Sequence, residues 1–332
     1  MRKIRVAQIG TSEFSHGSAI FGALVKCPDV FEIVGYALPE GEREKFPRRM
    51  KRFEGYKELT VEEILADESI EAVIIETEEI YLTKYALMAA KAGKHIHMEK
   101  PGGLSLSDFE ELMSIVKKNG TVFHTGYMYR YNPAIADVIK RVKEGEIGEV
   151  VSVEAQMNCL HGVECVSWLS TFPGGMMFFL GCHMIDLVLQ IQGEPKAVIP
   201  FNRSSKRFEG VDSKDNGFAV LEYDRGASFV KTSGAEHCGF ERRQLVVTGT
   251  KGRFEIRPLE MAAGAYPLHC TDYNKGTGVD WKVGAEWTRS ENYDRYIPMM
   301  KSFAEMVAGE KENPYTCDYE LMLFKTILKC CE

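Results

Sequence analysis

The stretch HIHMEKPGG, residues 95–103, contains a lysine at a position suited to chemistry. Its apolar residues are typical of a short buried strand, which ends at Glu99 and Lys100, directly before Pro101. In parallel α/β sheets, ligands bind beyond the carboxyl ends of the strands. A lysine there can orient a substrate hydroxyl and tune the pKa of a neighbouring proton acceptor. The alternative is a solvated surface lysine, which the position at a strand end makes the less favoured interpretation.

The loop GTSEFS, residues 10–15, lies between the first apolar segment and the first helical pattern. Dinucleotide-binding turns at this place carry the pattern G-x-G-x-x-G, in which the first glycine makes the tight turn and the others allow close approach of pyrophosphate and helix. Here the three positions are Gly10, Ser12 and Ser15. Serine adds only a small side chain, and its hydroxyl can donate to a phosphate oxygen or cap a helix. By itself, the loop fits a cofactor turn and an α/β turn without nucleotide equally well.

The end of the second apolar segment is where an acid would bind the ribose hydroxyls of a dinucleotide. The segment ends instead at Leu38, which cannot accept a hydrogen bond, and Glu40 follows two residues later. Glu40 could take the role, although an exposed turn glutamate is the favoured interpretation. The nearest cation for a 2′-phosphate, Arg43, is expected in the next helix. These residues indicate a slight preference for NAD over NADP.

Short apolar segments alternate with helical patterns over the first 125 residues, which predicts a doubly wound parallel sheet covered on both faces. The pattern then changes to long alternating strands with hairpin turns at 224–226 and 249–252, interrupted by one helical segment over 176–193. We therefore expect an α/β protein with a domain at 1–125 and a second domain at 126–332 that contains a large, mainly antiparallel sheet. An alternative is that the last helix packs on the first domain. The five strands predicted in the first domain are residues 4–10, 31–38, 70–77, 94–100 and 121–127.

The composition of this 332-residue chain narrows the classes of function. A formal net charge of −7 argues against binding to nucleic acid or to an anionic membrane. No run approaches the roughly 18 apolar residues of a membrane span, and the N-terminal apolar run is too short for a signal peptide. Nine cysteines without C-x-x-C spacing indicate reduced thiols in the cytoplasm. No metal site is expected, because histidines and cysteines do not cluster with ligand-like spacing.

Several stretches resemble one known family. AGKHIHMEKP resembles the A-G-K-H-V-x-x-E-K-P signature of the Gfo/Idh/MocA oxidoreductases, the glucose–fructose oxidoreductase and inositol dehydrogenase group. PGGMMFFLGCHMIDLVLQIQG resembles the family's G-G-G-x-L-x-D-x-G-x-H-x-x-D helix, and the stretches at 126–155 and 315–328 resemble its linking region and closing helix. The resemblance covers nearly the whole chain. It implies a Rossmann domain for NAD or NADP and a second α/β domain whose open sheet covers the substrate and builds a homodimer or homotetramer.

The resemblance also implies roles for individual residues. The family lysine corresponds to Lys100, and the histidine that usually accepts the proton corresponds to His183. Together they imply hydride transfer between nicotinamide and a secondary alcohol of a sugar, inositol or related polyol, a task that suits a histidine titrating near neutrality. Without this resemblance, His183 would be interpreted as a buried helix histidine. Asp186, one helical turn later, either orients the imidazole or bonds across the domain interface.

The predicted site residues fall into two sets. The cofactor-binding set is Gly10, Thr11, Ser12, Glu13, Phe14, Ser15, Leu38, Thr77, Glu99 and Lys100. The substrate-binding set is Tyr127, Arg130, Asn158, His161, Trp168 and His183, with Asn132 beside them. For these substrate contacts the alternative is ordinary loop composition, since loops contain polar and aromatic residues in any case.

The chain departs from the family pattern around the expected site. Phe179 stands where the family usually has an aspartate, Glu78 and Glu79 stand where it often reads Pro-Asn, and Leu82 replaces a histidine. Two carboxylates beside a pyrophosphate would be unfavourable unless they point outward. An alternative function is therefore a catalytically impaired pseudo-dehydrogenase that acts as a sensor or structural subunit. A third is a lyase or hydrolase that uses tightly held NAD transiently.

Overall fold

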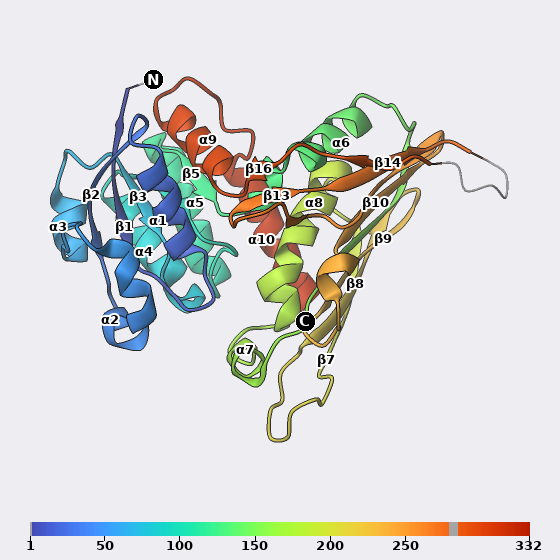
Figure 1. Cartoon of the computed structure of the whole chain (residues 1–332), viewed down its shortest axis with the longest axis horizontal. Helices are drawn as coiled ribbons and strands as arrows, with labels where there is room; N and C mark the ends of the chain where they lie inside the picture. The colour runs from blue at the N-terminus through green and yellow to red at the C-terminus, as the bar shows by residue number, and fades with distance from the viewer. Residues whose placement is uncertain (1, 279–284) are drawn as a thin grey trace. The chain divides into compact units, whose positions relative to one another are not determined.

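The computed structural model describes residues 2–278 and 285–332 (Figure 1). The chain forms two compact units. Unit 1 comprises residues 1–127 and 296–324, and unit 2 comprises residues 128–295 and 325–332. The main division thus follows Tyr127, and the C-terminal part of the chain contributes to both units.

Unit 1 is built on a five-stranded parallel sheet of order β2-β1-β3-β4-β5. The predicted doubly wound sheet is confirmed. Because the chain moves from β1 to β2 in one direction and from β2 to β3 in the other, right-handed crossovers place helices on both faces (Figure 1). The central strand β3 is fully buried, which explains its continuous apolar sequence. The strands are β1 Ile4–Ile9, β2 Phe31–Ala37, β3 Ala72–Ile75, β4 His95–Met98 and β5 Phe123–Thr125.

Capping residues mark the ends of two helices of unit 1, α3 and α5. Thr60 forms a capping box with Glu63, and Ser105, rather than Ser107, caps α5 by accepting from the N–H of Asp108. Gly120 ends α5 in the left-handed conformation. The helices are α1 Gly17–Lys26, α2 Glu42–Lys45, α3 Val61–Ala66, α4 Leu82–Lys91, α5 Leu106–Asn119 and α9 Ile297–Val307, with 3₁₀ turns η1 Pro47–Phe53 and η2 Glu79–Tyr81. Helix α10, Cys317–Cys331, is divided between the two units.

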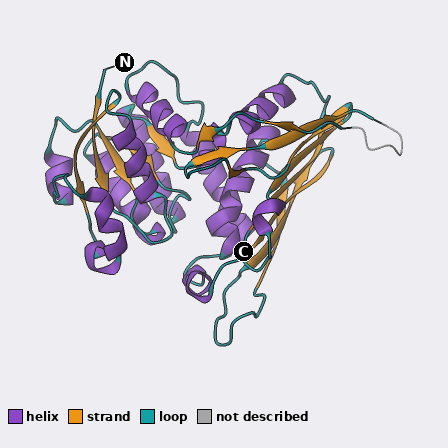
Figure 2. Cartoon of the chain, in the orientation of Figure 1, coloured by secondary structure: helices purple, strands orange, loops and turns teal. Residues whose placement is uncertain are grey.

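Unit 2 contains an eight-stranded sheet of order β15-β14-β11-β10-β6-β9-β8-β7. Figure 2 draws its strands in orange, and among the strands that the structure describes only β6 and β9 pair in parallel. The predicted mainly antiparallel sheet is confirmed, as are the hairpin turns between β8 and β9 and between β10 and β11. The strands are β6 Val150–Asn158, β7 Ala197–Arg203, β8 Asn216–Tyr223, β9 Gly226–Ser233, β10 Gln244–Gly249, β11 Gly252–Ile256, β14 Asp272–Gly276 and β15 Thr288–Arg289. A smaller sheet consists of β12 Met261–Ala262, β13 Leu268–Cys270 and β16 Tyr293–Asp294.

Helices cover one face of the large sheet. The helical segment predicted over 176–193 consists of a π-helical turn, η4 Met177–Gly181, followed by α8 Cys182–Gln192. Both pack on the central strands β6 and β9. A π-turn inserts one extra residue per turn and is frequent at functional sites. The other helices of unit 2 are α6 Pro133–Lys143 and α7 Val163–Leu169, with 3₁₀ turns η3 Met128–Tyr131 and η5 Gly239–Arg242.

Across the described part of the chain, no helix combines the length and apolar character needed to cross a bilayer.

Candidate functional site

The turn after β1 requires a glycine at position 10. Gly10 has a φ of 89°, in the region that favours glycine. A Cβ at this position would lie 2.4 Å from Cγ2 and 2.6 Å from the backbone nitrogen of Thr77, which follows β3. The ends of β1 and β3 therefore approach each other too closely for any side chain at Gly10. This geometry matches the first glycine of a dinucleotide-binding turn.

The serines of the loop fold it by local hydrogen bonds. Ser12 Oγ accepts from the N–H of Ser15 at 3.2 Å, and Ser15 Oγ accepts from the N–H of Gly17 at 3.2 Å. The Gln8 side chain donates to the carbonyls of Gly10 at 3.0 Å and Gly17 at 3.3 Å, which ties the two ends of the loop together. The two serine hydroxyls thus hold the backbone of the loop in one conformation. Glu13 is half exposed and lies near Arg49, and Phe14 is partly buried.

The end of β2 contains an acid that the sequence analysis did not single out. Glu42, on α2, is fully buried, and its Oε2 accepts from the N–H of Thr11 at 3.1 Å. Burial raises the pKa of Glu42 to about 9, so the carboxyl holds its proton at neutral pH. Only the alternation of three glutamates within residues 40–44 marks this segment in the sequence, and it does not tell which one turns inward.

The other residues near the end of β2 that the sequence analysis named, Leu38, Glu40 and Arg43, contact other side chains of this chain. Leu38 packs, partly buried, against a core cluster of Phe21, Tyr36 and Phe53. Glu40 accepts from Tyr85 at 2.7 Å and pairs with Lys84 at 2.5 Å. Arg43 lies in α2, as expected, and pairs with Glu58.

The two glutamates after Thr77 differ sharply. Glu78 is 21% exposed and pairs with Lys45 at 3.0 Å. Glu79 is 1% exposed, and neither of its carboxyl oxygens has a hydrogen-bond partner within the described residues. Burial raises the pKa of Glu79 to about 8 against the opposing influence of Lys100. At neutral pH one glutamate is therefore neutralised by a lysine and the other mainly by its own proton, which removes the electrostatic objection to two carboxylates here.

Glu99 and Lys100, directly after β4, are both 1% exposed. One carboxylate oxygen of Glu99 accepts from the Lys100 N–H at 3.0 Å, and the other lies 3.0 Å from His16 Nδ1 and accepts from the His16 N–H at 3.3 Å. Burial alone would raise the pKa of Glu99, but His16 and Lys100 lower it to about 2. Lys100 Nζ lies 3.9 Å from Glu99 Oε1. Glu99 thus connects the loop after β1 to the predicted catalytic lysine within unit 1.

In unit 2, His183 lies in the first turn of α8 and is 1% exposed. Its ring meets the ring of Tyr129 nearly edge to face, with centroids 5.5 Å apart and an interplanar angle of 79°. Asp186 accepts two hydrogen bonds from Arg130 Nε, at 3.0 and 3.2 Å, and one from Arg130 Nη2 at 2.8 Å. Gln190 donates to the same carboxylate at 2.9 Å. Asp186, on α8, therefore holds the side chain of Arg130, which lies in η3 near the start of unit 2.

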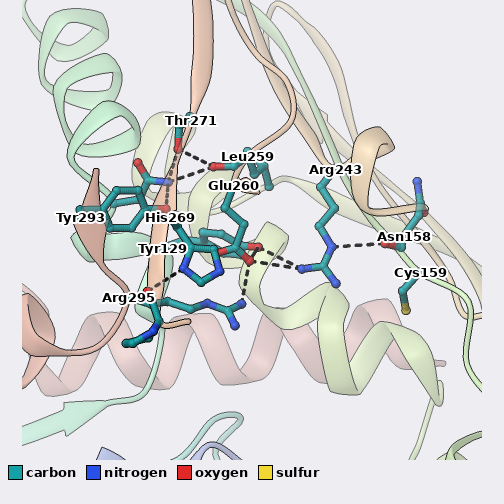
Figure 3. A network of polar contacts seen from close by, with 12 residues as sticks. Tyr129, Asn158, Cys159, Arg243, Leu259, Glu260, His269, Thr271, Tyr293 and Arg295 are labelled. Carbon is teal, nitrogen blue, oxygen red and sulfur yellow. Dashed lines mark hydrogen bonds and ion pairs between the residues drawn. The ribbon is translucent and has the colours of Figure 1, made fainter. Parts of the chain in front are cut away.

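A second buried carboxylate of unit 2, Glu260, lies beside Tyr129 (Figure 3). The Tyr129 hydroxyl donates to Glu260 Oε1 at 2.8 Å, and the same oxygen accepts from Arg295 at 2.7 Å and Arg243 at 3.3 Å. Burial would raise the pKa of Glu260, but Arg295 and Arg243 hold it below its ordinary value. The sequence analysis missed Tyr129, Glu260, Arg243 and Arg295, because only the folded chain brings these distant residues together.

Three further predicted substrate contacts, Asn158, His161 and Trp168, lie on different elements of unit 2. Asn158, the last residue of β6, is fully buried, and its carbonyl accepts from Arg243 at 3.2 Å. His161 Nε2 lies 3.0 Å from Cys159 Sγ, and burial lowers its pKa, as do Arg243 and Arg207. Trp168, on α7, packs edge to face on Phe179, with centroids 5.0 Å apart.

Tyr127, the first residue of the substrate-binding set, and Asn132, named beside that set, have different surroundings. Tyr127 is buried and belongs to unit 1. Asn132 caps α6 and donates to the Leu259 carbonyl, the Thr271 hydroxyl and the Tyr293 hydroxyl, so its side chain joins α6 to the segment around β13. Among residues 2–278 and 285–332, no group of three or more histidines, cysteines, aspartates or glutamates is placed to hold a metal ion.

Comparison with known families agrees with this geometry. Residues 4–127 match the oxidoreductase family with an NAD-binding Rossmann fold, GFO_IDH_MocA, and residues 135–255 match the GFO/IDH/MocA C-terminal domain. This chain belongs to the Gfo/Idh/MocA oxidoreductase family. The suspected family is thereby confirmed.

Relatives within the Gfo/Idh/MocA family include characterised dehydrogenases. The chain is 30% identical to scyllo-inositol 2-dehydrogenase (NAD(+)) of Bacillus subtilis over 59% of its own length and 58% of that enzyme. It is 25% identical to scyllo-inositol 2-dehydrogenase (NADP(+)) of the same organism over 71% of its length and 67% of that enzyme. An uncharacterized oxidoreductase of Schizosaccharomyces pombe is 27% identical over 80% of this chain and 75% of its own.

Solved structures show the same Gfo/Idh/MocA fold. The 3-ketoreductase KijD10 from Actinomadura kijaniata superposes with a TM-score of 0.79 at 18% identity, covering 98% of this chain and 96% of its own. An oxidoreductase from Thermotoga maritima gives a TM-score of 0.79 at 17% identity, covering 100% of this chain and 96% of its own. At these identities the likeness concerns the fold.

Proposed function

We propose that this Gfo/Idh/MocA chain is an NAD(P)-dependent dehydrogenase that transfers hydride between nicotinamide and a secondary alcohol of a sugar, inositol or related polyol. Lys100 carries this proposal, since a lysine that is 1% exposed at the carboxyl end of a parallel strand is poorly explained as a surface residue. The names of the two inositol dehydrogenases among the relatives support the substrate class.

The turn after β1 fits a dinucleotide. Gly10 allows the close approach of β1 to Thr77 that a Cβ would prevent, and Ser12 and Ser15 hold the loop in shape. Proton-holding Glu42 and Glu79 leave this edge of the sheet less negative than its sequence indicates. The residues predicted to hold the cofactor are those of the loop together with Thr77, Glu99 and Lys100. When bound, the nicotinamide supplies the hydride donor or acceptor.

We further propose a preference for NAD over NADP. The cation nearest the end of β2, Arg43, is already paired with Glu58. A 2′-phosphate would have to compete with that carboxylate for Arg43, whereas ribose hydroxyls need no cation. We expect NAD to bind severalfold more tightly than NADP in calorimetric titrations.

The protein residues handle the proton in this proposal. Lys100 orients the substrate hydroxyl, and a ring nitrogen of His183 takes its proton during oxidation and returns it during reduction. Tyr129 holds the imidazole edge, and the hydrogen bond from Tyr129 to Glu260 fixes the tyrosine in turn. Asp186 acts on this site through Arg130, which it holds in place.

We also propose that the chain works in the cytoplasm as a homodimer or homotetramer. Its nine cysteines, all within the described residues, form no disulfide, and most of them are buried, as in a reducing compartment. The uncovered face of the large sheet presents apolar side chains, among them Ile199 at 50% and Phe201 at 48% exposure. The rings of Phe218 and Phe229 stack on neighbouring strands, with centroids 5.2 Å apart. A second copy would bury this surface.

The test is turnover followed at the nicotinamide absorbance band with a panel of sugars and inositols. Lys100→Ala and His183→Ala should each lower kcat about 10²–10⁴-fold. Lys117→Ala is the matched control, because this exposed lysine pairs only at the surface with Asp318 and should leave turnover unchanged. Undiminished turnover in either active-site variant would refute its role. Failure to bind either NAD or NADP in titration would refute the dehydrogenase itself.

A further inference from the structure

A pocket of about 350 Å³ lies within unit 2, and its walls include none of the residues predicted to bind substrate or cofactor. One part of the wall is apolar, formed by Phe240, Met261 and Ala262. The other part is polar, formed mainly by Glu260, His269 and Arg295. Phe240 is 58% exposed, so the apolar wall includes an aromatic ring that reaches solvent.

Glu260 offers this pocket an acceptor atom. Its side chain is only 4% exposed, and all three donors to it, from Tyr129, Arg243 and Arg295, reach the same oxygen, Oε1 (Figure 3). Within the part of the chain that the structure describes, the second oxygen, Oε2, has no hydrogen-bond partner. A buried carboxylate oxygen without a donor is costly, and a ligand that enters the pocket lined by Glu260 and donates to this oxygen would remove that cost.

His269 adds a second acceptor on the same wall. Its Nδ1 lies 2.7 Å from the carbonyl oxygen of Pro267, and a carbonyl can only accept. The proton of the neutral ring is therefore on Nδ1, which makes Nε2 an acceptor. The polar wall thus combines these two acceptors with an arginine, and Glu241, an exposed carboxylate, lies at the same pocket.

Charge distinguishes between the possible donors. A hydroxyl and an ammonium group could each donate to Glu260 Oε2. Two guanidiniums, of Arg243 and Arg295, lie within 3.3 Å of the other oxygen of the same carboxylate and would repel a cation. A neutral hydroxyl meets no such repulsion, and the C–H face of a sugar ring packs well on an aromatic side chain such as Phe240.

We infer that this pocket is a binding site for a small polyhydroxylated ring, with hydroxyls donating to Glu260 Oε2 and His269 Nε2 and an apolar ring face against Phe240 and Met261. The site goes beyond the proposed dehydrogenase function, because it needs neither nicotinamide nor turnover. It adds a second place on unit 2 at which the chain can recognise a polyol.

The test is isothermal titration of the full chain, without nucleotide, with myo-inositol and glucose as probes. Wild type should bind one of them, and Ala262→Trp, which fills the pocket and leaves the ionic cluster intact, should weaken that binding at least tenfold. Glu260→Gln should weaken it similarly. Ala265→Trp is the matched control, since Ala265 is exposed on the same segment and does not line the pocket, and its affinity should equal that of wild type.

His183→Ala separates this pocket from the predicted site of hydride transfer. The variant should keep the binding that Ala262→Trp removes. Equal affinity in wild type and Ala262→Trp, loss of all polyol binding in His183→Ala, or binding of propylammonium in place of polyols would each overturn the inference. None of these results depends on turnover, so a failure here is distinct from a failure of the dehydrogenase assay.

Discussion

Buried carboxyl groups at the strand ends of unit 1 and those around Tyr129 and His183 in unit 2 have different partners. In unit 1, Glu42 and Glu79 are buried without a salt bridge in the described residues, and burial raises their pKa values to about 9 and 8. In unit 2, Asp186 and Glu260 are equally buried but accept several hydrogen bonds from arginines. Glu42 and Glu79 are thus neutralised by protons, whereas the acids of unit 2 are neutralised by guanidinium groups; Glu99 differs from its neighbours in unit 1, because His16 and Lys100 keep it ionised.

This difference suits what each region has to do in the proposed reaction. A strand edge that receives a pyrophosphate benefits from acids that are uncharged near neutral pH. A region that fixes a proton-transferring histidine benefits from rigid, directional ion pairs, because bidentate arginine–carboxylate contacts fix orientation as well as distance. The following predictions test these two arrangements separately.

The largest effect is expected from Asp186→Ala in unit 2. Removal of this carboxylate leaves the guanidinium of Arg130, a residue only 6% exposed, without the partner that holds it, which should lower the free energy of unfolding by about 3–5 kcal/mol. Chemical denaturation measures the loss. The double variant Arg130→Met with Asp186→Leu should recover most of it, since it leaves no isolated charge. A single-variant loss under about 1 kcal/mol would show that the pair is not a rigid support.

Gly10→Ala tests the backbone packing of unit 1. A methyl group 2.4 Å from Thr77 Cγ2, at a φ of 89°, should cost about 2–4 kcal/mol of stability and abolish NAD binding in titration. Gly93→Ala is the matched control, because Gly93 has a φ of 73° with nothing within 4 Å of an added Cβ. It should cost only about 1 kcal/mol and leave binding intact. Similar losses in both variants would mean that the contact with Thr77 does not matter.

Glu79→Gln tests the protonated acid of unit 1 and should have a smaller effect. Because the folded-state pKa of about 8 lies above the ordinary value of 4.5, the native state binds more protons than the unfolded state between these values. Stability should therefore fall as pH rises through this window. Glutamine removes the titration, so the variant should melt about 2–5 °C above wild type at pH 9 and differ less at pH 5.

Its neighbour Glu78 provides the control. Glu78 is partly exposed and pairs with Lys45, so Glu78→Gln should change stability by less than about 1 kcal/mol. Thermal melts of both variants across pH would distinguish them. A melting difference for Glu79→Gln that does not grow with pH would contradict the assignment of a proton to this carboxyl.

Most of the fold could be predicted because local sequence patterns determine it. Strands β1, β2 and β3 of unit 1 are short, mainly apolar segments, of which β3 is continuously apolar, and β8 of the large sheet alternates between faces, so these patterns are visible in the chain. The turn at Asp224–Arg225 and the glycine at position 10 carry their own conformational preferences. Helix α7 was missed, since its seven residues are too few to show a helical period.

The candidate site was less predictable. Lys100 and Gly10 lie at the ends of strands, where position along the chain is close to position in space. The fourfold cluster of Tyr129, Glu260, Arg243 and Arg295 has no such signal, because Tyr129 and Glu260 are 131 residues apart. The difference between Glu78 and Glu79 was likewise beyond the sequence, since two identical neighbouring residues point into different surroundings.

The sequence by itself determined the order of strands and helices, the tight turn at Gly10 and the strand-end position of Lys100, because these depend on side-chain period and backbone conformation. Tertiary structure alone decided which acids are charged. Glu79 is neutral because the fold buries it, whereas Glu260 is ionised because the fold brings two arginines to it from distant segments. The charge state of a buried carboxyl group depends on its desolvation and on its neighbours in space, and neither can be predicted from the local sequence.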